Sequence, residues 1–176
     1  MKTKNLVMAG LFLALGLVMP FLTGQIPSLG NKLLPMHIPV LLCGFVCGGP
    51  TGLIVGFILP ILRSVLFSMP PMYPMAMSMA FELAVYGFVA GVMYRVLPKK
   101  NIYIYIALII SMIAGRIVWG IVSTLIYGLS GVKFTWQLFI AGGFINAIPG
   151  IIIQIILIPI IVIAMKRANL IENEPK

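Results

Sequence analysis

Long apolar runs alternate with short polar or proline- and glycine-rich interruptions along this chain of 176 residues. A helix needs about 20 mostly apolar residues to cross a lipid bilayer, and several of the runs reach that length. The strongest interruptions are the turn at 47–52, with sequence CGGPTG, and the segment at 69–74, with sequence MPPMYP. The pattern predicts six helical spans, at about 5–23, 34–48, 51–69, 75–97, 102–128 and 136–165.

Composition excludes most other classes of protein. The chain is 61% hydrophobic and only 9% charged, with a mean hydropathy of +1.16. A soluble domain of this length cannot bury so much apolar surface, and disordered chains are poor in apolar residues. Six spans use about 120 residues, which leaves no room for a soluble catalytic module. We therefore expect an all-α integral membrane protein, with residues 1–176 forming a single six-helix membrane domain.

Basic residues are distributed unevenly between the two sides of this predicted topology. One side carries Lys2, Lys4, Arg95, Lys99, Lys100, Lys166 and Arg167, whereas the other carries Lys32 and Lys133. Loops rich in lysine and arginine stay in the cytoplasm, so both termini are predicted to be cytoplasmic. The net charge of +9 is thus interpreted as a topology signal, and no nucleic-acid partner is expected.

Four ionisable residues fall within the predicted spans, where each is costly and hence a candidate functional residue. Arg63 and Glu82 lie at matching depth on adjacent antiparallel spans, so they either form an ion pair with each other or contact a ligand. Arg116 lies deeper, with no spare acid, and is neutralised by an anionic ligand group such as a carboxylate, by backbone carbonyls or by lipid phosphate. His37 is an outer-mouth contact, a proton-linked residue or a satisfied imidazole near Pro35.

Helical spacing aligns polar and small residues into three stripes on the last three spans. The stripes are Met75, Met79, Glu82 and Tyr86; Arg116, Gly120, Ser123 and Tyr127; and Gly143, Asn146, Gly150 and Gln154. They predict a common interior cavity, with Trp119 lining it or lying in the interfacial belt. The candidate substrate-binding residues are Arg63, Glu82, Tyr86, Arg116, Trp119, Ser123, Asn146 and His37. Pro149 frees the carbonyl of Ile145 and is expected to kink the last span beside Asn146.

Several kinds of chemistry lack their signatures. The chain has no aspartate and no nucleotide-binding motif, so we expect neither an enzyme nor a bound cofactor. Cys43 and Cys47 are interpreted as buried small hydrophobes, because no further cysteine or histidine completes a metal site. The longest connection, residues 24–33, is either a lid over an outward-facing site or a plain connector.

The chain resembles the substrate-binding S components of energy-coupling factor (ECF) transporters, which import vitamins in prokaryotes. The resemblance covers nearly the whole chain and rests on its size, six spans, the long loop after the first span, and the runs LPMHIPV at 34–40 and MAFELAVYG at 79–87. It is nearest to riboflavin- and pantothenate-type members. It implies a multi-pass protein of the prokaryotic cell membrane that binds a small vitamin, with pantothenate favoured and pyridoxine-, pyrimidine- or queuosine-precursor-like compounds as alternatives.

The resemblance also implies partners: a transmembrane coupling subunit and two cytoplasmic ATPases. The S component is expected to topple in the membrane to release its substrate. Small residues of the first span dock onto the coupling subunit in such proteins, and here Gly10 and Ala14 match that motif, with glycine in place of the first alanine. An autonomous small-solute carrier or channel is the alternative class.

Overall fold

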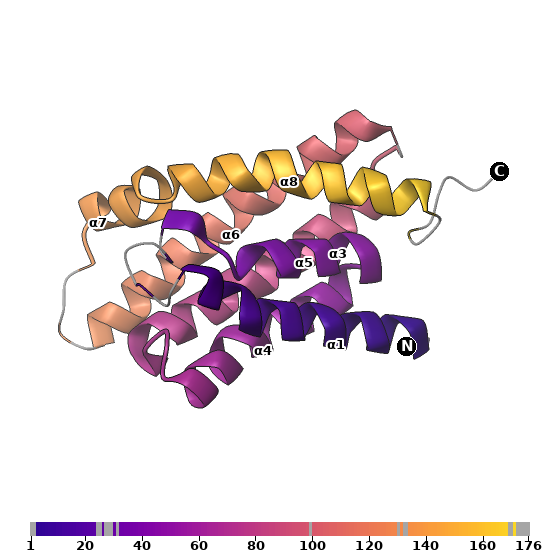
Figure 1. The fold of residues 1–176 in the computed structure, drawn as a ribbon. Coiled ribbons are helices and arrows are strands. Elements are labelled where there is room, and N and C mark those ends of the chain that lie inside the picture. The colour runs from indigo at the N-terminus through magenta and orange to yellow at the C-terminus, as the bar shows by residue number, and fades with distance from the viewer. Residues whose placement is uncertain are drawn as a thin grey trace.

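The computed structural model describes residues 3–23, 26, 30, 32–98, 100–129, 131, 134–168 and 171. Every secondary-structure element in these ranges is helical, as the sequence predicts (Figure 1). The elements are α1 Thr3–Val18, the 3₁₀ turn η1 Met19–Thr23, α3 His37–Cys47, α4 Gly49–Phe67, the π-helical turn η2 Met72–Ala76, α5 Met77–Val96, α6 Asn101–Leu129, α7 Trp136–Ile140, the π-helical turn η3 Ala141–Ile145, and α8 Ile148–Arg167.

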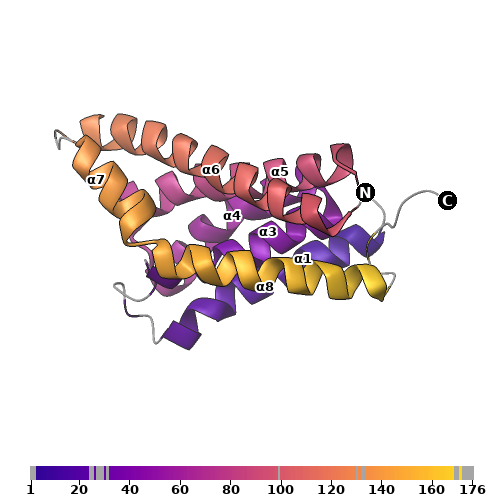
Figure 2. The same ribbon diagram turned by 90° about the horizontal axis from the view of Figure 1, so that it is seen from above.

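Five helical segments of the described chain are long and apolar enough to cross a membrane. They are Thr3–Leu22, Gly49–Phe67, Met72–Val96, Asn101–Leu129 and Trp136–Arg167. The remaining predicted span, 34–48, contains α3, an apolar helix of only 11 residues. Chain direction alternates along the bundle, so α1 begins and α8 ends at the same end of the bundle (Figures 1 and 2).

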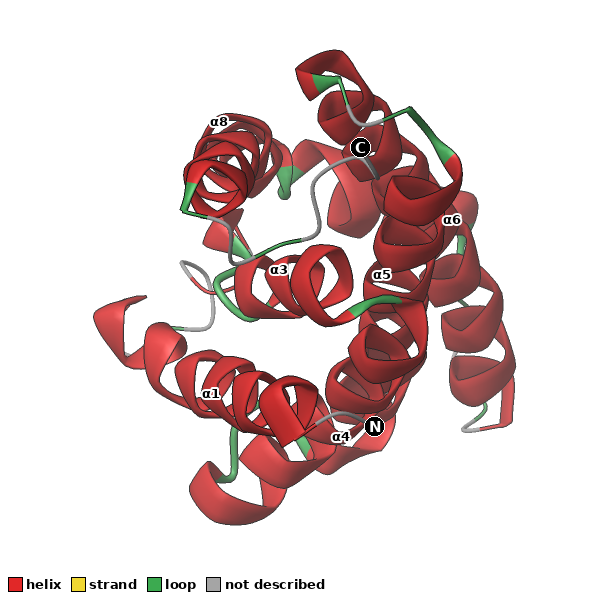
Figure 3. Ribbon diagram, turned by 90° about the vertical axis from the view of Figure 1, so that its right-hand side faces the viewer, coloured by secondary structure: helices red, strands yellow, loops and turns green. Residues whose placement is uncertain are grey.

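The short helix α3 lies in the interior of the bundle. Of its residues, all but Val46 are buried, and it packs against α1, α4, α5 and α8 (Figure 3). It starts later than predicted because Leu34 takes a left-handed conformation and a turn follows at Pro35 and Met36. A helix surrounded by protein is not required to match the thickness of the hydrocarbon layer. Burial therefore accounts for a central helix shorter than its neighbours.

Glycines allow α3, α4 and α5 to approach at backbone distance. A β-carbon on Gly52 would come within 2.6 Å of the Gly87 carbonyl oxygen, and one on Gly44 would overlap the same carbonyl. Small residues at such crossings bring helices into close contact in membranes. The three helices therefore pack in close contact, and this packing fixes the position of α5.

The last predicted span is not one continuous helix. The turn η3 and a bend at Asn146–Ala147 separate α7 from α8, and Pro149 stands in the first turn of α8. The kink predicted beside Asn146 is therefore confirmed, and Trp136–Arg167 remains one membrane-length segment. Proline supplies no backbone N–H, which suits the first turn of a helix and not its interior.

Candidate functional site

Three ionisable side chains meet in the interior between α3, α5 and α6. Nη1 of Arg116 lies 2.7 Å from Oε1 of Glu82, and Nε2 of His37 lies 3.4 Å from the same oxygen. His37 and Glu82 are each 1% exposed and Arg116 is 4% exposed. One carboxylate thus links a cation on α6 to an imidazole at the start of α3, and we call these three residues the charged cluster.

Tyr86 completes one wall of the charged cluster. Its ring is fully buried and meets the His37 ring edge-on, with centroids 5.1 Å apart. The ring fits against α6 only because Gly115 has no side chain: a β-carbon there would overlap it. Glycine one residue before Arg116 therefore allows α5 and α6 to bring Glu82 and Arg116 into contact.

The predicted ion pair between Arg63 and Glu82 is wrong. Arg63 donates from Nη1 to the Leu17 carbonyl at the end of α1. Its guanidinium also lies 5.1 Å from the ring centroid of Phe21 and 5.2 Å from that of Phe67. Matching depth on neighbouring helices does not determine which face carries a side chain, and α4 directs Arg63 toward α1. The sequence analysis found no acid available to Arg116, whereas in the structure Glu82 is its partner.

One edge of the Arg116 guanidinium has no hydrogen-bond partner among the described residues. Nε and Nη2 are buried and form no hydrogen bond within the described residues. The Tyr86 hydroxyl interacts with Arg116 electrostatically but does not reach hydrogen-bond geometry. Two adjacent N–H groups in one plane match the two oxygens of a carboxylate. The buried hydroxyl of Ser123, two helical turns further along α6, is likewise without a partner in the described chain.

Trp119 belongs to an aromatic group at the junction of α6 and α7. Its ring stacks on Phe139 with centroids 6.1 Å apart and meets Phe134 edge-on at 5.6 Å. A β-carbon on Gly143 would lie 3.4 Å from the Trp119 ring and 3.9 Å from Cδ of Arg116. Glycine in η3 therefore lets the turn approach both side chains, and Trp119 lies beside the charged cluster.

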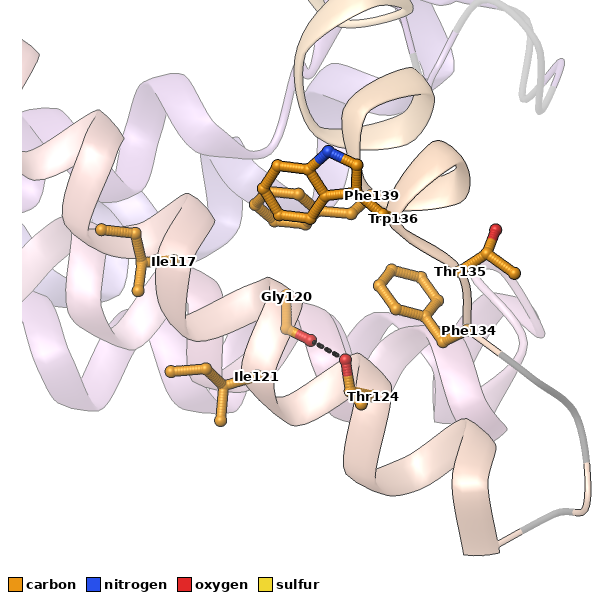
Figure 4. Close-up of a pocket in the computed structure, with 8 residues that line it drawn as sticks. All are labelled: Ile117, Gly120, Ile121, Thr124, Phe134, Thr135, Trp136 and Phe139. Carbon is orange, nitrogen blue, oxygen red and sulfur yellow. Dashed lines mark hydrogen bonds between the residues drawn. The ribbon is translucent and has the colours of Figure 1, made fainter.

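An apolar cavity of about 410 Å³ opens between α6 and α7 near these rings (Figure 4). Its lining residues are Ile117, Gly120, Ile121, Thr124, Phe134, Thr135, Trp136 and Phe139. Thr124 in the lining donates to the Gly120 carbonyl, and Oγ1 of Thr135 accepts from Leu138 N–H. The charged cluster does not line this cavity, whose surface is mostly aromatic and aliphatic.

Asn146 does not share the buried stripe predicted for the last span. It is exposed at the bend between η3 and α8, whereas Gly143, Gly150 and Gln154 are buried. The turn at Asn146–Ala147 interrupts the helix, and Ala147 is buried there in place of Asn146. Sequence reasoning placed Gln154 on the stripe but omitted it from the candidate residues, although its burial is complete.

Other predicted features lie outside the charged cluster. Gly10 and Ala14 lie on the exposed side of α1, and a β-carbon on Gly10 would meet no atom within 4 Å. Cys43 and Cys47 are free and buried, as predicted. Among the described residues, no group of three or more histidine, cysteine or acidic side chains is arranged to hold a metal ion. Most of the predicted lid or connector at 24–33 lies outside the described residues, as do Lys2, Lys99 and Lys133.

The fold and the charged cluster define a multi-pass helical membrane protein with a buried arginine. Within the described residues, only part of the hydrogen-bonding capacity of this arginine is used. The family described as ECF transporter, substrate-specific component, matches residues 4–162, and the chain belongs to this family. It is therefore a substrate-binding subunit of an ECF importer, a transporter component and not an enzyme. Comparisons with curated proteins and with solved structures give no match.

Proposed function

We propose that this subunit binds a carboxylate-bearing vitamin or related micronutrient, with pantothenate favoured over pyridoxine-, pyrimidine- or queuosine-precursor-like compounds. The observation that carries the proposal is the free edge of Arg116, with Nε and Nη2 buried and unpaired within the described residues. Leaving such donors without a partner inside a protein costs several kcal/mol in total, at roughly 1–3 kcal/mol for each group. A substrate carboxylate supplies two acceptors in the matching geometry.

The surrounding side chains suit recognition of a small polar molecule. Trp119 presents an aromatic face beside Arg116, and the Ser123 hydroxyl is available on the same helix. Glu82 holds Nη1 of Arg116 and so orients the free edge of the guanidinium. In this arrangement Glu82, His37 and Tyr86 position the arginine, and Arg116 binds the substrate.

The membrane topology and the partners belong to the same proposal. Six crossings place both termini in the cytoplasm of a prokaryotic cell, on the side that carries most of the basic residues. The exposed side of α1 around Gly10 and Ala14 docks onto a transmembrane coupling subunit, which works with two cytoplasmic ATPases. Toppling of the subunit on that partner releases the substrate inside. Exposure of both small residues supports this docking face.

A thermal-shift screen of the purified protein against a panel of water-soluble vitamins tests the proposal. A ligand that binds the folded state raises the unfolding temperature, so a carboxylate-bearing vitamin is expected to give the largest shift. Arg116→Gln should abolish that shift, whereas Arg63→Gln should keep it, because Arg63 contacts α1 instead of the charged cluster. Equal binding by Arg116→Gln and the wild type would refute the carboxylate site. Solute flux in liposomes that contain this chain alone would favour the carrier or channel.

A further inference from the structure

Gln154 on α8 carries a polar side chain with no hydrogen-bond partner in the part of the chain that the structure describes. It is 0% exposed, and neither Nε2 nor Oε1 forms a hydrogen bond within the described residues. A buried amide left unpaired costs roughly 1–3 kcal/mol for each unmet group, and lipid offers no water to replace the missing partner. A leucine at this position would avoid that cost, so the glutamine calls for an explanation beyond packing.

Two serine hydroxyls in the spans, unlike that of Ser123, donate to carbonyls one helical turn back. Ser78 donates to the Pro74 carbonyl at 3.0 Å, and Ser111 donates to the Leu108 carbonyl at 2.7 Å. Among the described residues, Gln154 has neither such a bond nor one to a neighbouring helix, although hydrogen bonds between helices are a common use of glutamine in membranes. The amide therefore does not act as a link between helices in this structure.

Gln154 lies on a helix that packs against two of the helices that carry the charged cluster. It lies on the buried side of α8, one turn after Gly150, and α8 packs against α3 and α6 (Figure 3). A β-carbon on Gly150 would come within 2.7 Å of the Lys32 carbonyl, so this side of α8 meets the chain just before His37 begins α3. His37 lies on α3 and Arg116 lies on α6, so both are on helices that pack against α8.

We propose that Gln154 is a specificity-determining residue of the substrate site, and that its amide hydrogen-bonds a neutral group of the substrate that both donates and accepts, such as a carboxamide or a hydroxyl. The inference rests on the proposed function and extends it. Arg116 binds the carboxylate at one end of the substrate, and Gln154 hydrogen-bonds a polar group that points toward α8. The substrate class is thus a carboxylate joined to an uncharged hydrogen-bonding group.

Gln154→Leu separates this role from a structural one. The change removes an unpaired amide and keeps a similar volume, so the ligand-free protein should unfold at the same temperature as the wild type or higher. A lower unfolding temperature would overturn the proposal, because it would show that the amide is already bonded within the protein. Gln137→Leu, on the exposed side of α7, is the matched control for replacing a glutamine by leucine.

Binding of pantothenate and panthenol supplies the second measurement. Panthenol keeps the amide and hydroxyls of pantothenate but carries an alcohol in place of the carboxylate. Gln154→Leu should weaken binding of both compounds by about 10- to 100-fold, the factor for one or two hydrogen bonds lost to an unpaired group. Arg116→Gln should weaken pantothenate far more than panthenol, and Gln137→Leu should change neither.

The outcomes distinguish the inference from the proposed function. Full pantothenate affinity in Gln154→Leu, with the Arg116→Gln effect intact, overturns the inference and leaves the proposed function standing. No binding of pantothenate by the wild type contradicts the favoured substrate and the inference that rests on it.

Discussion

Replacing Glu82 with glutamine removes the carboxylate that holds Arg116 in the interior of the bundle. The substitution preserves the shape of the side chain and leaves the arginine charge buried with its nearest anion gone. Glu82 is the only acid before residue 172, since the other two are Glu172 and Glu174. The variant therefore isolates the pairing of one buried charge, and Glu172→Gln serves as a control of equal charge change.

The expected loss of stability follows from the distance between Arg116 and Glu82. At the 2.7 Å separation of Nη1 and Oε1, two unit charges attract by about 6 kcal/mol with an effective dielectric constant of 20. Part of this attraction offsets the cost of removing both groups from water, and measured losses on breaking a buried pair are roughly 3–5 kcal/mol. We expect Glu82→Gln to lower the free energy of unfolding by that amount. The double variant Glu82→Gln/Arg116→Met should recover most of the loss, because no charge is left behind.

Unfolding in mixed micelles of a mild and a denaturing detergent measures these free energies for the wild type, both single variants and the double variant. The expected interaction energy in this cycle is about 3 kcal/mol, well above the roughly 0.3–0.5 kcal/mol within which independent sites add. Additive losses in the double variant would refute the reasoning, since they would mean that Arg116 does not depend on Glu82.

Three further predictions concern packing, docking and the second arginine. Gly115→Ala should destabilise the protein by about 1–3 kcal/mol because its methyl group overlaps the Tyr86 ring, whereas Gly128→Ala, which meets nothing within 4 Å, should be neutral in the same unfolding assay. Gly10→Leu should keep vitamin binding but stop uptake by cells that express the whole importer; normal uptake would remove this position from the docking face. Arg63→Met should cost about 1–3 kcal/mol of stability through lost hydrogen bonding and cation–π contact, with vitamin affinity unchanged in titration calorimetry.

The sequence predicted the helices better than the way in which they face one another. Apolar runs and proline- and glycine-rich interruptions located each helix to within a few residues, since those signals are local. The pairing of Glu82 with Arg116 depends on how α5 and α6 rotate about their axes, and that rotation is set by contacts such as Gly115 against Tyr86. Asn146 was misplaced for a related reason, because the turn at Asn146–Ala147 buries Ala147 and leaves Asn146 exposed.

Arg63 and Arg116 differ in how their charges and hydrogen-bond donors are paired. Burial does not separate them, since they are 2% and 4% exposed. Arg63 caps the end of α1 through the Leu17 carbonyl and lies against two aromatic rings, all within one corner of the bundle. Arg116 has a full counter-charge on one side and, within the described residues, two unpaired donors on the other. Because Glu82 holds this arginine in place while two of its donors lack a partner there, the proposed function assigns substrate binding to Arg116 and not to Arg63.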